Sequence, residues 1–318
     1  MGSSGIFGIV RFLRFSKRGN RTNLINCKNL KKIKDSIGKP EPLKKILRTK
    51  FAATKAILAI NVQSLQQIEI VAALSIKLGK EVIIQFSAKY IPYFDNLIGI
   101  TRILDRYRNH KYLYFHLDHC VDESLISDCI NWGFDSVMFD GSGFPIKENI
   151  KKTQHIVLLA HDKGVLVEGE VGVIAGVEDG FGSGGSTVFN VADALSFYNE
   201  TKVDMLALGI GNAHGIYKTS DNVDVNLLST FQNHLNQKKA YLVLHGGTGL
   251  DDNQILKAIE YGVVKVNIST EFKLLYQSVI NQLGTRKVHD EIYFYDLLKN
   301  NLQPATVNIV KKLDGQCI

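Results

Sequence analysis

Several residue types are scarce in this 318-residue chain, and their scarcity narrows the classes of protein it can belong to. It has one tryptophan, five prolines and four cysteines, at positions 27, 120, 129 and 317. The cysteines are scattered and form no Cys-x-x-Cys pair, which argues against a disulfide framework and against a thiolate zinc site. No uncharged apolar stretch reaches the roughly 18 residues that a membrane helix needs. The scattered cysteines fit a reducing compartment. With 45% hydrophobic and 22% charged residues, we expect a large buried core.

Acidic residues are absent from residues 1–34, which hold nine Lys or Arg. This segment carries +9, so the remainder carries −2 of the net +7, and nucleic acid is not an expected partner of the body. An acid-free, Arg-rich segment is typical of an organelle import peptide, a basic binding arm or a cloning remnant. We predict that residues 1–40 form a poorly ordered basic extension without a catalytic role, followed by one domain over residues 41–318. The expected location is the cytoplasm, with import through residues 1–34 as the alternative.

From residue 57 onward, eight short apolar runs alternate with helical patterns. The runs cover residues 57–62, 81–87, 112–119, 136–142, 166–172, 205–211, 240–247 and 263–269. Several of the intervening segments place apolar residues at helical spacing and end in glycine. Strands that are apolar on both faces and separated by helices belong to a parallel sheet that is covered on both sides. Eight such units favour a single-domain (β/α)8 barrel over an open doubly wound sheet, with a C-terminal helical segment after it.

Polar residues stand at the ends of these strands, where barrels of this type carry their chemistry. The third run ends in Asp118 and His119, and His214 and His245 follow the sixth and seventh runs. Three neutral imidazoles with one open position make a catalytic zinc site, whereas a single histidine is more often structural. Adjacent residues of a strand point to opposite faces, so Asp118 and His119 can both serve only if the strand ends there. The other residues at the strand ends are Asn61, Ser87, Asp140, Glu170 and Asn267.

Glycines and hydroxyl residues follow the last three strands. The segments are HGIYK, HGGTG and NIST. Backbone N–H groups at such places commonly bind phosphate at the C-terminal face of a barrel, and Lys218 adds a positive charge. The alternative is that Gly246, Gly247 and Gly249 only permit a tight turn.

Six longer motifs carry a family resemblance. In order along the chain they are HLDHC, SVMFDGS, VEGEVGVIAGVEDG, VDMLALGIGNAHGIYK, LHGGTGL and AIEYGVVKVNISTEF. From about residue 57 to residue 283 the sequence resembles the class II, zinc-dependent fructose-bisphosphate and tagatose-bisphosphate aldolases. The resemblance implies a glycolytic lyase that reversibly cleaves fructose 1,6-bisphosphate into dihydroxyacetone phosphate and glyceraldehyde 3-phosphate. The alternatives are a preference for tagatose 1,6-bisphosphate or a ketose 1-phosphate, or a barrel that binds zinc and sugar phosphate without turnover.

The resemblance also implies roles for individual residues. His119, His214 and His245 would hold the zinc ion, Asp118 would exchange the proton of the C4 hydroxyl, and Glu178 would exchange the proton at C3. The residues expected around the substrate and its phosphate are Asn61, Ser87, Gly215, Lys218, Gly247, Asn267, Ser269 and Thr270, supported by Asp140 and Glu170. A monovalent cation near the phosphate site and a homodimer or larger homo-oligomer are further expectations.

The sequence departs from the family pattern near its C-terminus. Relatives often carry Tyr-Asp-Pro-Arg-Lys there, and the arginine helps to bind the far phosphate of the substrate. Here the segment is Tyr-Asp-Leu-Leu-Lys, with Leu297 and Leu298 in place of the proline and arginine. Recognition of the far phosphate is therefore in question, with Lys299, Arg286 and Lys287 as candidate substitutes.

Overall fold

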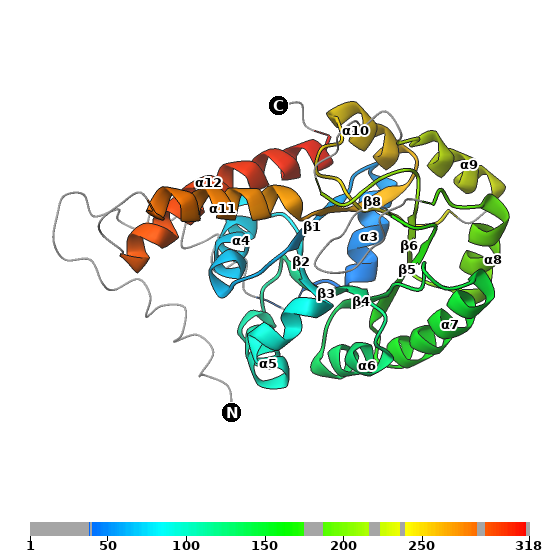
Figure 1. Cartoon of the computed structure of the whole chain (residues 1–318), viewed down its shortest axis with the longest axis horizontal. Coiled ribbons are helices and arrows are strands. Elements are labelled where there is room, and N and C mark those ends of the chain that lie inside the picture. The colour runs from blue at the N-terminus through cyan, green and yellow to red at the C-terminus, as the bar shows by residue number, and fades with distance from the viewer. Residues whose placement is uncertain are drawn as a thin grey trace. The chain divides into compact units, whose positions relative to one another are not determined.

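The computed structural model describes residues 38, 40–174, 187–215, 223–235, 239–284 and 290–315, except for the side chains of residues 96 and 97. Eight parallel strands close into a barrel in the order β1 to β8 (Figure 1). The strands are β1 Ile57–Asn61, β2 Val82–Ser87, β3 Leu113–Cys120, β4 Ser136–Phe139, β5 Leu166–Val171, β6 Met205–Leu208, β7 Leu242–Leu244 and β8 Val263–Ile268. Each overlaps one of the eight predicted runs, so the predicted (β/α)8 barrel is confirmed.

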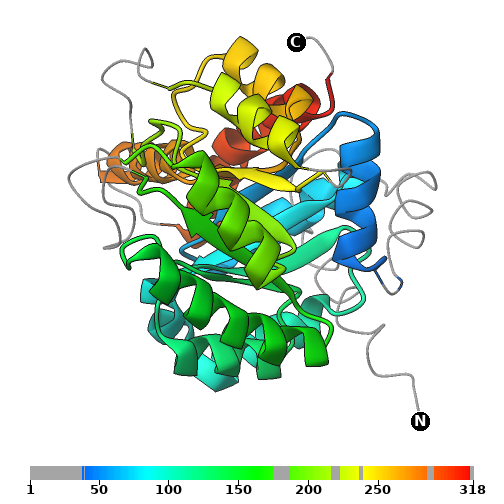
Figure 2. The same cartoon turned by 90° about the vertical axis from the view of Figure 1, so that its right-hand side faces the viewer.

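Helices alternate with the strands and cover the outside of the barrel (Figures 1 and 2). They are α4 Leu65–Leu78, the 3-10 helix η1 Ala88–Phe94, α5 Asn96–Tyr107, α6 Glu123–Trp132, α7 Ile146–Asp162, α8 Val191–Thr201, α9 Asn226–His234, α10 Asp252–Glu260, α11 Thr270–Gly284 and α12 Glu291–Leu313. Local sequence sets their bounds. In α4, for example, Ser64 and Gln67 form a capping box at the start, and Gly79, at φ 66°, adopts the left-handed conformation that ends the helix.

An additional helix, α3 (Leu43–Ala52), closes the barrel at the end where the strands begin. It lies in the middle of the ring in Figure 1 and at one end of the barrel in Figure 2. Leu43 and Leu47 are buried in one apolar cluster with Ile57 and Tyr114, which lie near the starts of their strands. Helix α3 therefore covers the end of the barrel where the strands begin. A site for substrate is expected at the opposite end, where the strands finish.

The last two helices, α11 and α12, run side by side (Figure 1). Helix α12 also packs against α4 and β1. Leu298, at the position where relatives carry the arginine, is fully buried in the core between these elements. Lys299 is half-buried, whereas Arg286 and Lys287 lie outside the described residues. How the far phosphate is recognised therefore stays a prediction.

Every described residue belongs to one compact unit that runs from Ser36 to Ile318. The predicted boundary between an extension and a barrel domain at residue 40 stays a prediction. Among the helices of the described segments, none combines the length and the hydropathy that crossing a membrane requires.

Candidate active site and metal centre

A distortion of β3 brings two neighbouring side chains to the same place. The strand does not end at His119, as the sequence argument required, but continues to Cys120. His119 has a φ of 44°, and the pairing of β3 with β4 shifts register between Leu117 and Cys120. Such a β-bulge re-aims side chains that a regular strand would send to opposite faces. Asp118 and His119 therefore both reach the centre of the rim, by a route that the sequence argument did not foresee.

Three imidazoles converge at this rim. His119 comes from β3, His214 from the loop after β6, and His245 from the position directly after β7. The ring centroid of His119 lies 4.9 Å from that of His214 and 4.7 Å from that of His245. Each ring offers one nitrogen to a group of atoms that all lie within 4.8 Å of one another. The three predicted ligands thus form one cluster, and His119 also groups with Asp140 and Glu170 in a way that could hold an ion.

Carboxylates behind two of these rings fix which nitrogen each ring presents. His119 places Nδ1 2.8 Å from Asp140 Oδ2, and His245 places Nε2 2.7 Å from Glu168 Oε1. A neutral imidazole donates its N–H to such a carboxylate, so its other nitrogen carries a lone pair. These other nitrogens, His119 Nε2 and His245 Nδ1, lie 2.9 Å apart. A hydrogen bond between these nitrogens requires one ring to carry a second proton, whereas with both rings neutral a cation between them removes the repulsion of the two lone pairs, so this donor set fits a metal ion.

The charges around the rings point the same way. Four carboxylates, those of Asp118, Asp140, Glu168 and Glu170, lie in or directly beneath this cluster, and among the described residues the buried ammonium of Lys265 pairs with one of them, Glu168. Burial, together with the charge of Asp140, raises the pKa of Glu170 well above its ordinary value. A divalent cation would offset this surplus of negative charge.

Asp118 is held by amides from β1 and β8, which do not pair with its own strand β3. Its Oδ2 accepts a 2.7 Å hydrogen bond from Asn61 Nδ2, and its Oδ1 lies 3.4 Å from Asn267 Nδ2. Gln85 Nε2 in turn donates to Asn61 Oδ1 at 3.2 Å. Burial alone would raise the pKa of Asp118, but neighbouring positive charges hold it below its ordinary value: those of the imidazoles when they are protonated, that of His119 first, and that of Lys265. The carboxylate is thus oriented and ready to accept a proton.

The predicted phosphate residues lie where β7 and β8 end and α11 begins. Gly247 N donates to Asn267 O at 3.2 Å, and a Cβ at Gly247 would lie 2.9 Å from Val266 Cγ1, so the close approach of this loop to β8 favours glycine. Ser269 precedes Thr270, the first residue of α11, so both stand at the positive end of the helix dipole. Within the described residues, the buried hydroxyl of Ser269 makes no hydrogen bond, and an arriving anion would supply one.

Not every predicted residue can be placed in this site. Glu178 and Lys218 lie outside the described residues. Gly215 has a φ of 101°, in the region that favours glycine. The buried hydroxyl of Ser87 and the side-chain oxygen of Asn267 lack hydrogen-bond partners in the part of the chain that the structure describes, as is common for groups that contact a ligand.

Comparisons with known proteins identify the family. The family model described as fructose-bisphosphate aldolase class-II matches residues 41–316. The chain belongs to the class II fructose-bisphosphate aldolase family. Membership in this metal-dependent family makes the protein a lyase that breaks and forms a carbon–carbon bond.

Individual relatives agree with this assignment. A fructose-bisphosphate aldolase of Ureaplasma parvum is 38% identical over 248 residues, which are 76% of this chain and 83% of that one. One of Streptococcus pneumoniae is 43% identical over 170 residues, 53% of this chain and 56% of the relative. The crystal structure of a fructose-1,6-bisphosphate aldolase candidate from Coccidioides immitis superposes with a TM-score of 0.79 at 26% identity, and covers 86% of this chain and 96% of that one. The YdjI aldolase of Escherichia coli K12, at 20% identity and a TM-score of 0.72, shares the fold.

Beneath the aldolase rim lies a set of polar residues, most of which the strand-end pattern of the sequence does not single out. We call them the polar layer: Gln85, His116, Ser136, Glu168 and Lys265, all with 0% exposure. Barrel interiors are usually filled by branched apolar side chains. The signal was present in the sequence, because Gln85, His116, Glu168 and Lys265 each precede by two positions a residue at a strand end, and such pairs share a face.

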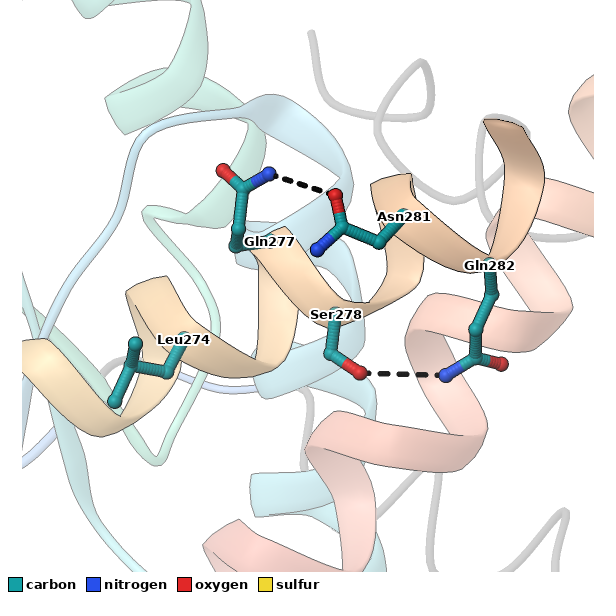
Figure 3. Close-up of a pocket in the computed structure, with 5 residues that line it drawn as sticks. All are labelled: Leu274, Gln277, Ser278, Asn281 and Gln282. Carbon is teal, nitrogen blue, oxygen red and sulfur yellow. Dashed lines mark hydrogen bonds between the residues drawn. The ribbon is translucent and has the colours of Figure 1, made fainter. Parts of the chain in front are cut away.

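The aldolase also has a hollow of about 460 Å³ along α11 (Figure 3). Leu274, Gln277, Ser278, Asn281 and Gln282 line it. Gln277 Nε2 donates to Asn281 Oδ1 at 3.1 Å, and Gln282 Nε2 donates to Ser278 Oγ at 3.3 Å (Figure 3). None of these five side chains is ionisable, so the hollow offers no acid, base or metal ligand.

Proposed function

We propose that the protein catalyses the reversible aldol cleavage of fructose 1,6-bisphosphate, with His119, His214 and His245 as zinc ligands. The observation that carries this proposal is the convergence of the three imidazoles, two of them backed by carboxylates. Zinc bound there would supply a Lewis acid that stabilises the negative charge left on the dihydroxyacetone phosphate half.

Asp118 is the proposed acid and base at the C4 hydroxyl. In cleavage its carboxylate takes the hydroxyl proton as the C3–C4 bond breaks, and in condensation it returns that proton to the aldehyde oxygen. Its amide contacts with Asn61 and Asn267 keep one carboxylate orientation and favour the ionised form. Glu178 is the proposed partner at C3, because a second proton must move on the other side of the bond.

The start of α11 is the proposed site for the C1 phosphate. Ser269 and Thr270 bring hydroxyls and backbone N–H groups to the N-terminus of α11, which favours an anion, and Gly247, whose N–H bonds Asn267 O, is the proposed neighbour of this site. Gly215 and Lys218 belong to the same proposal, and Asn267 and Ser87 would contact substrate hydroxyls. A monovalent cation beside the phosphate, assembly into a homo-oligomer and the location in the cell stay predictions.

Metal removal tests the proposal directly. Treatment with a strong chelator should abolish the release of triose phosphate from fructose 1,6-bisphosphate, and added zinc should restore it. The release is followed in a coupled assay, with tagatose 1,6-bisphosphate assayed beside it to rank the two epimers. Full cleavage by protein shown to be metal-free would refute the metal-dependent reaction. Zinc binding without cleavage of either epimer would favour the non-catalytic alternative.

A pair of histidine variants locates the metal. His214→Ala should lose both zinc and cleavage. His234→Ala should lose neither, because His234 lies on the exposed part of α9, with Nδ1 2.7 Å from Thr230 O. Zinc content by elemental analysis and cleavage rate are measured on both.

A further inference from the structure

The centre of the polar layer is Glu168, a carboxylate with no exposed surface and both oxygens engaged. Oε1 lies 2.7 Å from His245 Nε2, and Oε2 lies 2.7 Å from Lys265 Nζ. Lys265 is itself fully buried. His116 Nε2 lies 3.7 Å from Oε2, and His116 Nδ1 lies 2.8 Å from Ser136 Oγ. The carboxylate of Glu168 therefore connects Lys265, below the rim, to His245, one of the proposed metal ligands.

The contact with Glu168 decides how His245 can bind a metal. His119 and His245 present different nitrogens to the site, Nε2 from the first and Nδ1 from the second. His245 can offer a lone pair on Nδ1 only when its proton is on Nε2, and Glu168 is the acceptor at Nε2. Without an acceptor there, the proton could move to Nδ1 and block the metal.

Lys265 keeps that acceptor in place. A fully buried carboxylate is unfavourable unless a nearby charge balances it. His116 does not provide that charge, because burial and the ammonium of Lys265 lower its pKa to about 3. Lys265 thus balances Glu168 and occupies one of its oxygens, which leaves the other oxygen for His245.

We propose that Glu168 and Lys265 form a positioning pair that holds His245 in the tautomer that ligates the metal through Nδ1. Neither residue touches the substrate or the metal; both act through His245. This inference rests on the proposed function, because it takes His245 as a metal ligand.

The variant Glu168→Gln tests it while keeping the shape of the side chain. An amide has one acceptor oxygen for two buried donors, Lys265 and His245. If Lys265 takes the oxygen, the amide N–H faces Nε2 and drives the proton of His245 to Nδ1. The zinc dissociation constant, measured by competition with a chromogenic chelator, should rise about 10–100-fold. The visible spectrum of the cobalt-loaded protein should change, because it reports the ligand set.

The double variant Glu168→Gln/Lys265→Met should recover most of the lost zinc affinity. With the ammonium gone, the amide oxygen is free to accept from His245 Nε2. Replacing both members of a buried ion pair is also tolerated better than removing one. Because a folding defect would also be relieved in the double variant, the unfolding temperature of the zinc-free protein is measured beside the zinc dissociation constant: positioning predicts a loss and recovery of zinc affinity that the unfolding temperature does not follow.

Lys50→Met is the matched control. Lys50 is buried at the other end of the barrel, where its Nζ lies 3.1 Å from Asp314 Oδ1 and 3.5 Å from Glu81 Oε2. This variant should lower the unfolding temperature of the zinc-free protein and leave the zinc dissociation constant unchanged.

The outcomes separate this inference from the function beneath it. Wild-type protein that binds no zinc would remove the proposed metal centre itself. Wild-type protein that binds zinc, with Glu168→Gln binding it equally well, would overturn only the positioning pair. So would an affinity loss that Lys50→Met reproduces, or one that the double variant fails to reverse.

Discussion

His119 meets two demands that are difficult to combine in one residue. It must follow Asp118 directly and still point into the same site, and this places its backbone at a φ of 44°. A non-glycine residue in that region is strained by about 1–2 kcal/mol. The hydrogen bond between its Nδ1 and Asp140 Oδ2 fixes the ring in the distorted position. Strain of this kind persists where the surrounding contacts over-determine it, and such places are commonly active sites.

At the same scale, Asp118 offers a test that separates chemistry from binding. Asp118→Asn keeps the size of the side chain but removes the proton acceptor, so kcat for cleavage should fall about 10²–10⁴-fold. Zinc content should stay at the wild-type level, because Asp118 is not a proposed ligand. Both are measured on one preparation, by the coupled assay and by elemental analysis. A kcat within tenfold of wild type would move the acid and base role to another residue.

At the scale of elements, the sequence predicts the barrel better than it predicts the inside of the barrel. Alternating apolar runs and helical patterns locate all eight strands, and because parallel strands end at one face, His119, His214 and His245 meet without any further assumption. Glu168 and Lys265 were not predicted because each stands two positions before a strand end, within an apolar run that predicts only a buried strand. The bulge at His119 depends on the register between β3 and β4, which no local pattern specifies. Helix α3 precedes the first strand and belongs to no repeated unit, so the repeat does not reveal it.

Helix α12 carries a test of the position where relatives have an arginine. Leu298 has 0% exposure in the core that α12 forms with α4 and β1. Leu298→Arg would bury a guanidinium without a planned partner, so the free energy of unfolding should fall by about 3–5 kcal/mol. Lys299→Arg is the control, because it keeps a cation at a half-buried position next to it and should leave stability nearly unchanged. Urea unfolding measures both.

The opposite result for Leu298→Arg would be informative about the substrate. A stable variant with a lower KM for fructose 1,6-bisphosphate, but not for fructose 1-phosphate, would place the far phosphate beside this part of α12. That outcome would contradict the burial argument.

At the scale of the whole molecule, the two ends of the barrel differ in role: one carries the proposed site residues, and the other is closed by packing. The end where the strands finish carries the histidines, carboxylates and glycine loops. The end where they begin is sealed by α3, whose Leu43 and Leu47 join the apolar cluster of the lumen. Ion pairs tie α3 to distant parts of the chain, since Lys50 contacts Asp314 and Lys44 Nζ lies 2.9 Å from Asp204 Oδ1. Stability is thus built at one end and chemistry at the other, as is usual for this fold.

Two truncations test where the working unit begins. Removing residues 1–37 takes away nine Lys or Arg and one Asp, so the net charge changes from +7 to −1, but it leaves α3 and all proposed site residues. Thermal stability, zinc content and kcat/KM should match those of the full chain, while retention on a cation exchanger at low salt should be lost.

Removing residues 1–54 also deletes α3. Because each buried leucine contributes about 1.5–3 kcal/mol and Asp314 would lose Lys50, one of its two lysine partners among the described residues, that protein should unfold at a clearly lower temperature or aggregate. A loss of cleavage on removing residues 1–37 would instead give the basic segment a part in catalysis, and an unchanged unfolding temperature without residues 1–54 would show that α3 is dispensable as the floor of the barrel.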